Sequence, residues 1–107
     1  MTQRSERALA LACLLALAGA AVASFSLTAV RTYGAGFPLD DAWIHQTYAR
    51  NLGLRGEWAF QPGVPSAGST SPLWTALLAL GYALHVSPTC WALAWGAMLL
   101  ALTAWVG

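Results

Sequence analysis

The feature that most constrains this chain is an uncharged apolar run of about 23 residues, from Ala8 to Val30. As a helix with a rise of about 1.5 Å per residue, this run would extend about 34 Å. That length covers the hydrocarbon core of a bilayer, which is roughly 30 Å thick. Small residues such as Gly19 would allow close packing against neighbouring helices. We therefore predict a membrane helix over residues 8–30.

The N-terminal region also has the features of a secretory signal peptide. Arg4 and Arg7 precede the apolar run, and residues 21–24 (Ala-Val-Ala-Ser) have the small-x-small pattern of a cleavage site. The apolar run continues past that site, however, and more apolar sequence of membrane length follows downstream. We therefore favour an uncleaved membrane helix over a cleaved leader.

Composition extends the membrane argument to the whole chain. Of the 107 residues, 58% are hydrophobic and 8% are charged, whereas soluble domains average about 25% charged residues. The net charge is +1 and there is no lysine, so no basic surface is available for nucleic acid. Cys13 and Cys90 lack the Cys/His spacing of a zinc site. We expect them to be small, reduced residues that face lipid or other helices.

A second uncharged stretch begins at Pro72 and continues to the last residue. Residues 85–89 (His-Val-Ser-Pro-Thr) divide it in two. The first part, residues 72–86, would be a helix of about 22 Å, which is short for a full crossing. It begins with Ser71 and Pro72, a pair typical of a helix start. The second part, residues 90–107, is the third predicted apolar helix.

Together these segments predict an all-α membrane protein with three apolar helices and an external loop of about 40 residues, residues 31–71. Arg4 and Arg7 favour a cytoplasmic N-terminus by the positive-inside rule, which leaves the loop outside. Arg31, at the start of the loop, counts against that orientation. Because no polar tail follows the third apolar segment, we expect the chain to be the N-terminal part of a longer, multi-pass membrane protein.

The loop contains a predicted amphipathic helix from Asp40 to about Arg55. Its apolar side chains recur every four residues, at positions 44, 48 and 52, and Gly53 or Gly56 would end it. With Trp43 and Trp58 nearby, such a helix suits the membrane interface. An ordinary amphipathic helix packed on its own domain is the alternative.

The rest of the loop is predicted to be extended or to turn. Pro38 marks a turn before the helix. Residues 57–60 form a short extended piece, and residues 61–63 (Gln-Pro-Gly) form a second turn.

Asp40 and Asp41 are the candidate reactive residues of the loop. An aspartate at a helix N-cap accepts backbone N–H bonds and interacts favourably with the helix dipole, which explains one of the two. Adjacent like charges repel, so the pair needs a further reason. Two carboxylates can hold a divalent cation, or one can act as a general base while the other orients it. From the residues alone, capping and catalysis both stay open.

His45 and Arg50 are secondary candidates, for substrate binding. His45 lies four residues after Asp41 on the same helical face, so a local hydrogen bond between them explains it as well as a substrate contact does. Arg50 and Arg55 could bind an anionic group such as phosphate. Lipid head-group contact or solvent exposure is the alternative for both.

An ordered series of short motifs runs through the loop from Phe37 to Trp74. It reads Asp40-Asp41-Ala42-Trp43-Ile44, Tyr48-Ala49-Arg50-Asn51-Leu52, Gly56, Phe60-Gln61-Pro62-Gly63 and Thr70-Ser71-Pro72-Leu73-Trp74. This series resembles the first external loop of polytopic glycosyltransferases of the GT-C fold. These enzymes use polyprenyl-phosphate-linked sugars, and they include protein mannosyltransferase-like and bacterial arabinofuranosyltransferase-like members.

The resemblance implies a bacterial cell-membrane enzyme that transfers a sugar from a polyprenyl phosphate to a hydroxyl of a glycan or protein acceptor. It implies that Asp40 and Asp41 activate the acceptor hydroxyl or help to bind a divalent cation, Mg²⁺ or Mn²⁺. It also implies many further membrane helices, which would supply most of the lipid-phosphate pocket. We therefore expect this chain alone to be inactive.

Two other functions fit the same sequence. In a small non-enzymatic integral membrane protein or subunit, Asp40 would only cap a helix. In a transporter or channel, ionisable residues usually lie within the spanning helices. This chain has only His85 at the border of an apolar segment, so we rank transport last.

Overall fold

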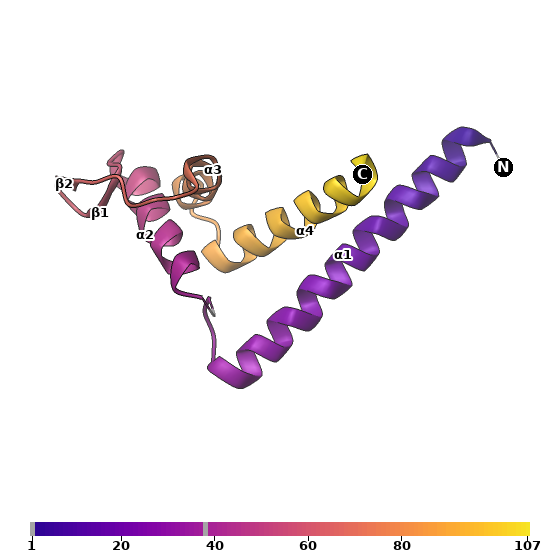
Figure 1. Cartoon of the computed structure of the whole chain (residues 1–107), viewed down its shortest axis with the longest axis horizontal. Coiled ribbons are helices and arrows are strands. Elements are labelled where there is room, and N and C mark those ends of the chain that lie inside the picture. The colour runs from indigo at the N-terminus through magenta and orange to yellow at the C-terminus, as the bar shows by residue number, and fades with distance from the viewer. Residues whose placement is uncertain (1, 38) are drawn as a thin grey trace. The chain divides into compact units, whose positions relative to one another are not determined.

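The computed structural model describes residues 2–37 and 39–107. Its elements in chain order are α1 (Gln3–Tyr33), α2 (Asp40–Arg55), β1 (Ala59–Gln61), β2 (Val64–Pro65), α3 (Pro72–Ala83) and α4 (Pro88–Val106) (Figure 1). They fall into two compact units. We call the residues up to Ala35 together with Leu93–Gly107 the helical unit, and Gly36–Ala92 the central unit. The turn predicted at Pro38 lies outside the described residues.

Two helices, α1 and α4, are long and apolar enough to cross a membrane. α1 has 31 residues and α4 has 19. Only 6% of the most apolar stretch of α1 and 11% of that of α4 are buried, so neither is covered as the core helix of a soluble protein is. The first and last predicted apolar segments are therefore confirmed as helices of spanning length.

α1 extends beyond the predicted residues 8–30 at both ends. Thr2 is its N-cap: its side chain accepts the Ser5 N–H at 3.4 Å, and the Ser5 hydroxyl donates to the Thr2 carbonyl at 2.7 Å. The helix ends at Gly34, whose φ of +85° is a conformation that glycine adopts without steric cost. Arg4 and Arg31 consequently belong to the helix rather than to its flanks.

α3 is shorter than the second predicted apolar helix, residues 72–86, which was already predicted to be short for a full crossing. It is apolar, but it has only 12 residues, which is a length of about 18 Å and too short to cross a bilayer. It ends before the predicted residue 86 because His85 takes a left-handed φ of +57°. The N–H of His85 then donates to the Tyr82 carbonyl, and the N–H of Val86 donates to the Gly81 carbonyl. This is the Schellman arrangement that closes a helix C-terminus.

The central unit also contains a small β-hairpin, which the all-α prediction missed. β1 and β2 pair in antiparallel fashion, with Ala59 opposite Pro65. The turn between them places Gly63 at a φ of +79° directly after Pro62, the residue order of a type II turn. The Glu57 carboxylate accepts the N–H of Gly63 at 2.9 Å and so holds the turn from outside the strands.

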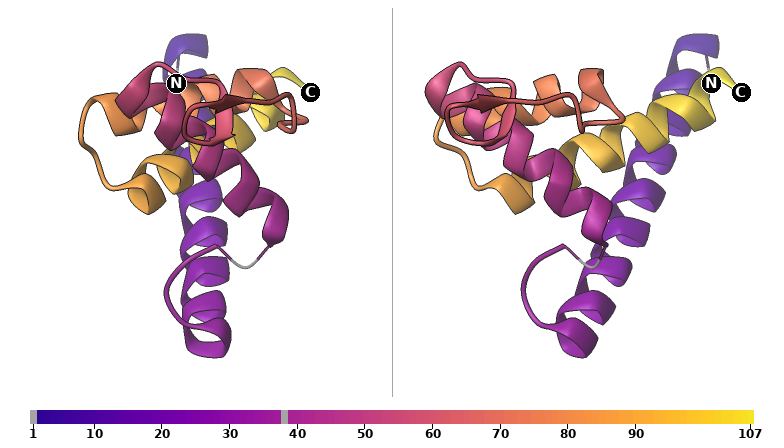
Figure 2. Two further views of the ribbon diagram at one scale, coloured as in Figure 1. Left: turned by 90° about the vertical axis from the view of Figure 1, so that its left-hand side faces the viewer. Right: turned by 60° about the vertical axis from the view of Figure 1, so that its left-hand side comes forward.

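α2 occupies the predicted residues, and Gly56 ends it with a left-handed φ of +70°. It packs against α3, and the hairpin lies near its C-terminal end (Figure 2). Gly53 makes the helix contact close, because a Cβ at this position would meet the Ala79 carbonyl and would lie 2.9 Å from the Tyr82 Cβ. Ala49, which is fully buried, belongs to the core cluster of this contact, together with Leu78, Ala79 and Ala92.

Candidate functional site

Asp40 and Asp41 lie in the first turn of α2, and both are exposed. The N-cap is Leu39, so the prediction that an aspartate caps this helix is wrong by one residue. Helical backbone already begins at Asp40, where a carboxylate still interacts favourably with the positive end of the helix dipole. Within residues 2–37 and 39–107, neither carboxylate has a hydrogen-bond or ion-pair partner. Both carboxylates are therefore available for a contact outside these residues.

The two carboxylates point to different sides of α2. Consecutive helix residues are about 100° apart around the axis and do not face each other. Asp41 therefore shares a side with His45, one turn on, whereas Asp40 shares a side with Trp43. Among the described residues, no group of three or more His, Cys, Asp or Glu side chains comes together.

His45 joins α2 to the loop and to α3 through a cluster of hydroxyl groups. Its Nδ1 lies 3.1 Å from the Ser69 Oγ and 3.3 Å from the Thr75 Oγ1, and the two hydroxyl oxygens are 2.8 Å apart. Thr75 is fully buried in the contact face of α3. The hydrogen bond expected between His45 and Asp41 is not among these contacts. A partly buried ring that is bound from the loop side does not swing freely towards Asp41.

Arg50 is exposed on α2, and its positive charge acts on the phenol of Tyr82, on α3. The Tyr82 hydroxyl donates to the Gln46 Oε1 at 2.8 Å. Burial raises the pKa of Tyr82 above its ordinary value, and the positive charge of Arg50 acts in the opposite direction. Arg50 is ten residues from Asp40, which is about 15 Å along the helix axis. The predicted site residues therefore form three separate groups along α2.

The motif residues between these groups have structural roles that the sequence did not reveal. The Asn51 amide donates to the carbonyls of Ala59 and Phe60, at 2.8 and 3.1 Å. The Tyr48 hydroxyl lies 2.7 Å from the Ser66 Oγ and accepts the Gly68 N–H at 2.8 Å. These contacts fix the hairpin and the following loop to α2. One sequence signal indicates such a role for Asn51. It follows Tyr48 by three residues on the buried face of α2, and a buried amide requires a hydrogen-bond partner.

Four residues near the predicted site were missed altogether: Gln46, Ser69, Thr75 and Tyr82. Gln46 precedes Arg50 by four residues, which places both on neighbouring parts of one helix face. The other three lie 24 to 36 residues away from their partners on α2. Only the fold brings them to His45 and Gln46.

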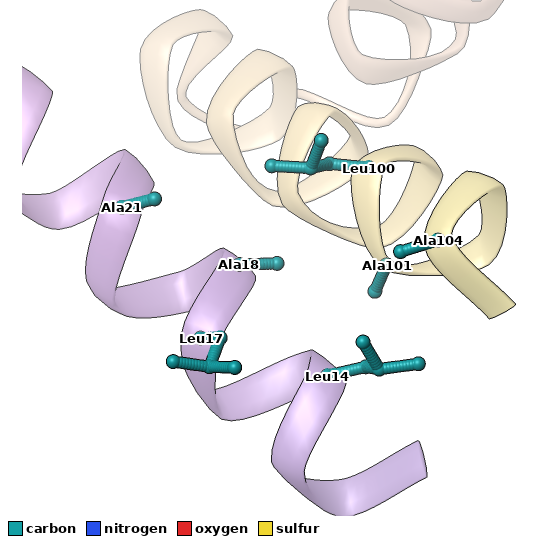
Figure 3. Close-up of a pocket in the computed structure, with 7 residues that line it drawn as sticks. All are labelled: Leu14, Leu17, Ala18, Ala21, Leu100, Ala101 and Ala104. Carbon is teal, nitrogen blue, oxygen red and sulfur yellow. The ribbon is translucent and has the colours of Figure 1, made fainter. Parts of the chain in front are cut away.

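The helical unit carries a different kind of feature, an apolar groove of about 250 Å³ between α1 and α4 (Figure 3). Leucine and alanine side chains line it, among them Leu14, Leu17, Ala18, Leu100 and Ala101. The lining contains no ionisable side chain, so it can accommodate hydrocarbon but offers no group for acid–base chemistry.

Comparisons of this chain with protein-family models, with curated proteins and with solved structures gave no match.

Proposed function

We propose that this chain is the N-terminal part of a multi-pass bacterial membrane glycosyltransferase. The enzyme would transfer a sugar from a polyprenyl-phosphate donor to a hydroxyl of a glycan or protein acceptor outside the cell. The motif series from Phe37 to Trp74 resembles the first external loop of GT-C enzymes. The division of roles among the motif residues in the central unit supports the proposal. Tyr48 and Asn51 are used to hold the loop in place, whereas Asp40 and Asp41 are exposed and unpartnered within the described residues.

That contrast is the observation that carries the proposal. A motif that served only to build a loop would use its charged residues in salt bridges, caps or turns, as Glu57 is used at Gly63. Here an acidic pair lies in the first turn of α2, where its one structural interaction is with the helix dipole. A helix that carries reactive groups in this way would orient them for catalysis.

In the proposed reaction, a carboxylate of the pair accepts the proton of the acceptor hydroxyl as general base. The acceptor oxygen then bonds to the anomeric carbon, while the bond from that carbon to the phosphate oxygen breaks. The electron pair leaves with the polyprenyl phosphate, and the anomeric configuration is inverted. If the enzyme uses Mg²⁺ or Mn²⁺, the exposed carboxylates of Asp40 and Asp41 would hold the ion.

The proposed topology places the N-terminus in the cytoplasm and residues 31–71 outside. α1 and α4 would anchor the central unit at the outer surface, where a lipid-linked donor presents its phosphate at the interface. A carboxylate in this unit could then meet both the donor and an acceptor that arrives from outside.

The test is to change Asp40→Asn and Asp41→Asn singly in the membrane protein that carries this segment. Transfer of labelled sugar from a polyprenyl-phosphate donor is then measured in membrane vesicles. Loss of the general base should lower the rate by about 10²-fold or more, while the amount of protein in the membrane stays unchanged.

The matched control is Glu57→Gln, which removes a charge from the same unit but keeps an oxygen to accept the Gly63 N–H. Its transfer rate should stay within about twofold of wild type. If transfer survives both aspartate changes, the catalytic proposal fails. The alternative would then be preferred, a small non-enzymatic integral membrane protein or subunit.

A further inference from the structure

A polar pocket lies at the N-terminal end of α1, within the helical unit. Its volume is about 410 Å³, and it is lined by Gln3, Glu6, Arg7 and Ala10 of α1 and by Trp105 of α4. The α1 residues recur every three or four positions, which places them on one face of the helix. The pocket therefore brings an amide, a carboxylate and a guanidinium together beside an indole ring.

The apolar groove of the helical unit lies on the same face of α1. Its lining residues from α1 are at positions 14, 17, 18 and 21, which continue the spacing of the pocket residues (Figure 3). α4 lines both features, with Leu100 and Ala101 in the groove and Trp105 in the pocket. The pocket and the groove therefore follow one another along the same two helices, and a ligand that fills both is amphiphilic.

The length of the groove matches the depth of one lipid leaflet. From Ala10, at the pocket, to Ala21, in the groove, α1 rises about 16 Å, and half of a hydrocarbon core of roughly 30 Å is about 15 Å. At the polar end the indole of Trp105 is 41% exposed, and tryptophan side chains gather at the level of lipid head groups. When α1 and α4 cross a membrane, the pocket thus lies at the head-group level and the groove lies beside the acyl chains of the same leaflet.

The charges of the pocket select the head group. Glu6 and Arg7 are exposed and consecutive, so they do not face each other, and neither has an ion-pair partner in the part of the chain that the structure describes. A ligand with a single charge would be attracted by one of them and repelled by the other. A zwitterion with a phosphate and a primary ammonium satisfies both, because the guanidinium donates to the phosphate and the carboxylate accepts the ammonium N–H groups.

We propose that the polar pocket and the apolar groove together bind one phospholipid whose zwitterionic head group carries a primary ammonium. The phosphate binds at Arg7, the ammonium binds at Glu6, and one acyl chain lies in the groove between α1 and α4. The lipid belongs to the leaflet on the side of the N-terminus. No residue of the central unit takes part, so the inference does not rest on the proposed enzyme activity.

The head-group test measures equilibrium binding of radiolabelled phosphatidylethanolamine to the delipidated full protein in neutral detergent micelles. Because the charges are exposed, wild type should bind it only about three- to fivefold more tightly than phosphatidylglycerol or phosphatidylcholine with the same acyl chains. A quaternary ammonium, as in phosphatidylcholine, has no N–H group to donate to Glu6.

Two substitutions locate the head group. Arg7→Gln should weaken phosphatidylethanolamine binding by about three- to fivefold. Glu6→Gln should abolish the preference for this lipid, because the amide keeps an acceptor oxygen but has no charge to attract the ammonium. Arg4→Gln is the matched control, since it removes the same charge from the same end of α1, does not line the pocket and should leave binding unchanged.

A second pair of variants locates the acyl chain. Ala21 is exposed and lines the groove, so Ala21→Leu places a larger side chain where the acyl chain lies and should weaken binding about tenfold. Ala23→Leu is its control, because two residues further on the side chain lies about 200° away, on the opposite side of α1. It should leave binding unchanged.

Three results would overturn the proposal. Equal affinity for the three phospholipids would mean that the helical unit has an unselective lipid surface. Equal effects within either pair of variants, Arg7→Gln with Arg4→Gln or Ala21→Leu with Ala23→Leu, would place the lipid elsewhere. Absence of saturable binding would favour a further helix as the occupant of the groove. Sugar transfer is not part of the measurement, so failure here is distinct from failure of the transfer assay.

Discussion

Different kinds of hydrogen bond occur within the helical unit and within the central unit. In α1 the side-chain hydroxyls of Ser26, Thr28 and Thr32 donate to carbonyls one turn back on the same helix. In the central unit, side chains such as Gln46 and Asn51 bond to residues on other elements. A long apolar segment can form a helix with hydrogen bonds inside that helix alone. A particular tertiary arrangement requires side chains that bond to specific residues on other elements. The helical unit therefore leaves most of its apolar surface uncovered, and the central unit defines its own fold.

The largest expected effect contrasts a glycine from each unit. Gly53→Ala in α2 would place a Cβ against the Ala79 carbonyl and 2.9 Å from the Tyr82 Cβ. Because backbone atoms of α3 must move, we expect a loss of about 3 kcal/mol in the free energy of unfolding. Gly19→Ala in α1 meets nothing within 4 Å, and it should stabilise its helix by about 0.5–1 kcal/mol.

Both variants are measured by denaturant unfolding of the purified protein in detergent micelles. Effects of opposite sign would support the division into a specifically packed unit and an unpartnered one. Equal losses would show that α1 is as closely packed as α2 in the folded protein, and the comparison would fail.

A second contrast concerns hydrogen bonds. Asn51 is 1% exposed and satisfies the carbonyls of Ala59 and Phe60. Asn51→Ala leaves both carbonyls without that donor, so it should cost about 2–3 kcal/mol and free the hairpin. Thr28→Ala removes an exposed bond within α1 and should cost less than about 0.5 kcal/mol. Limited proteolysis checks the first variant, because cleavage within residues 57–66 should become faster only when Asn51 is changed.

Local sequence patterns predicted the helices well, but they could not predict contacts between residues that are far apart in the sequence. The bounds of α2 follow from the four-residue recurrence of its apolar side chains and from Gly56. The extended piece and the turn of the β-hairpin were predicted, but its second strand and the pairing were not, since strands of three and two residues carry too few alternating positions to show a pattern. Its stability comes from Asn51 and Glu57, outside the strands.

The candidate site shows the same limit. The exposure of Asp40 and Asp41 agrees with their place at a helix start. For His45, the one-turn rule indicated Asp41 as a partner, but Ser69 and Thr75 are 24 and 30 residues further along the chain. The length of α3 was overestimated for a related reason, because hydropathy does not report the left-handed backbone of His85.

The smallest expected effect appears at alkaline pH, and it concerns the seam between α2 and α3. Burial raises the pKa of Tyr82 above its ordinary value of 10.0, so the unfolded chain loses this proton at a lower pH than the folded protein does. In that interval the unfolded state binds fewer protons, and stability therefore falls as pH rises. The contribution of protonated Tyr82 to the free energy of unfolding is complete below about pH 10, and it is lost as pH rises through the folded-state pKa of Tyr82.

Tyr82→Phe should abolish that decline, and Arg50→Gln should extend it to higher pH, because the charge that lowers the pKa of Tyr82 is then absent. The difference in phenolate absorbance between wild type and Tyr82→Phe follows the titration directly, and the same difference taken in the Arg50→Gln background should have a higher midpoint. An unchanged midpoint would mean that Arg50 lies away from the seam in the folded protein. In that case the contrast between a central unit organised by specific polar contacts and a helical unit without them would no longer extend to this face of α2.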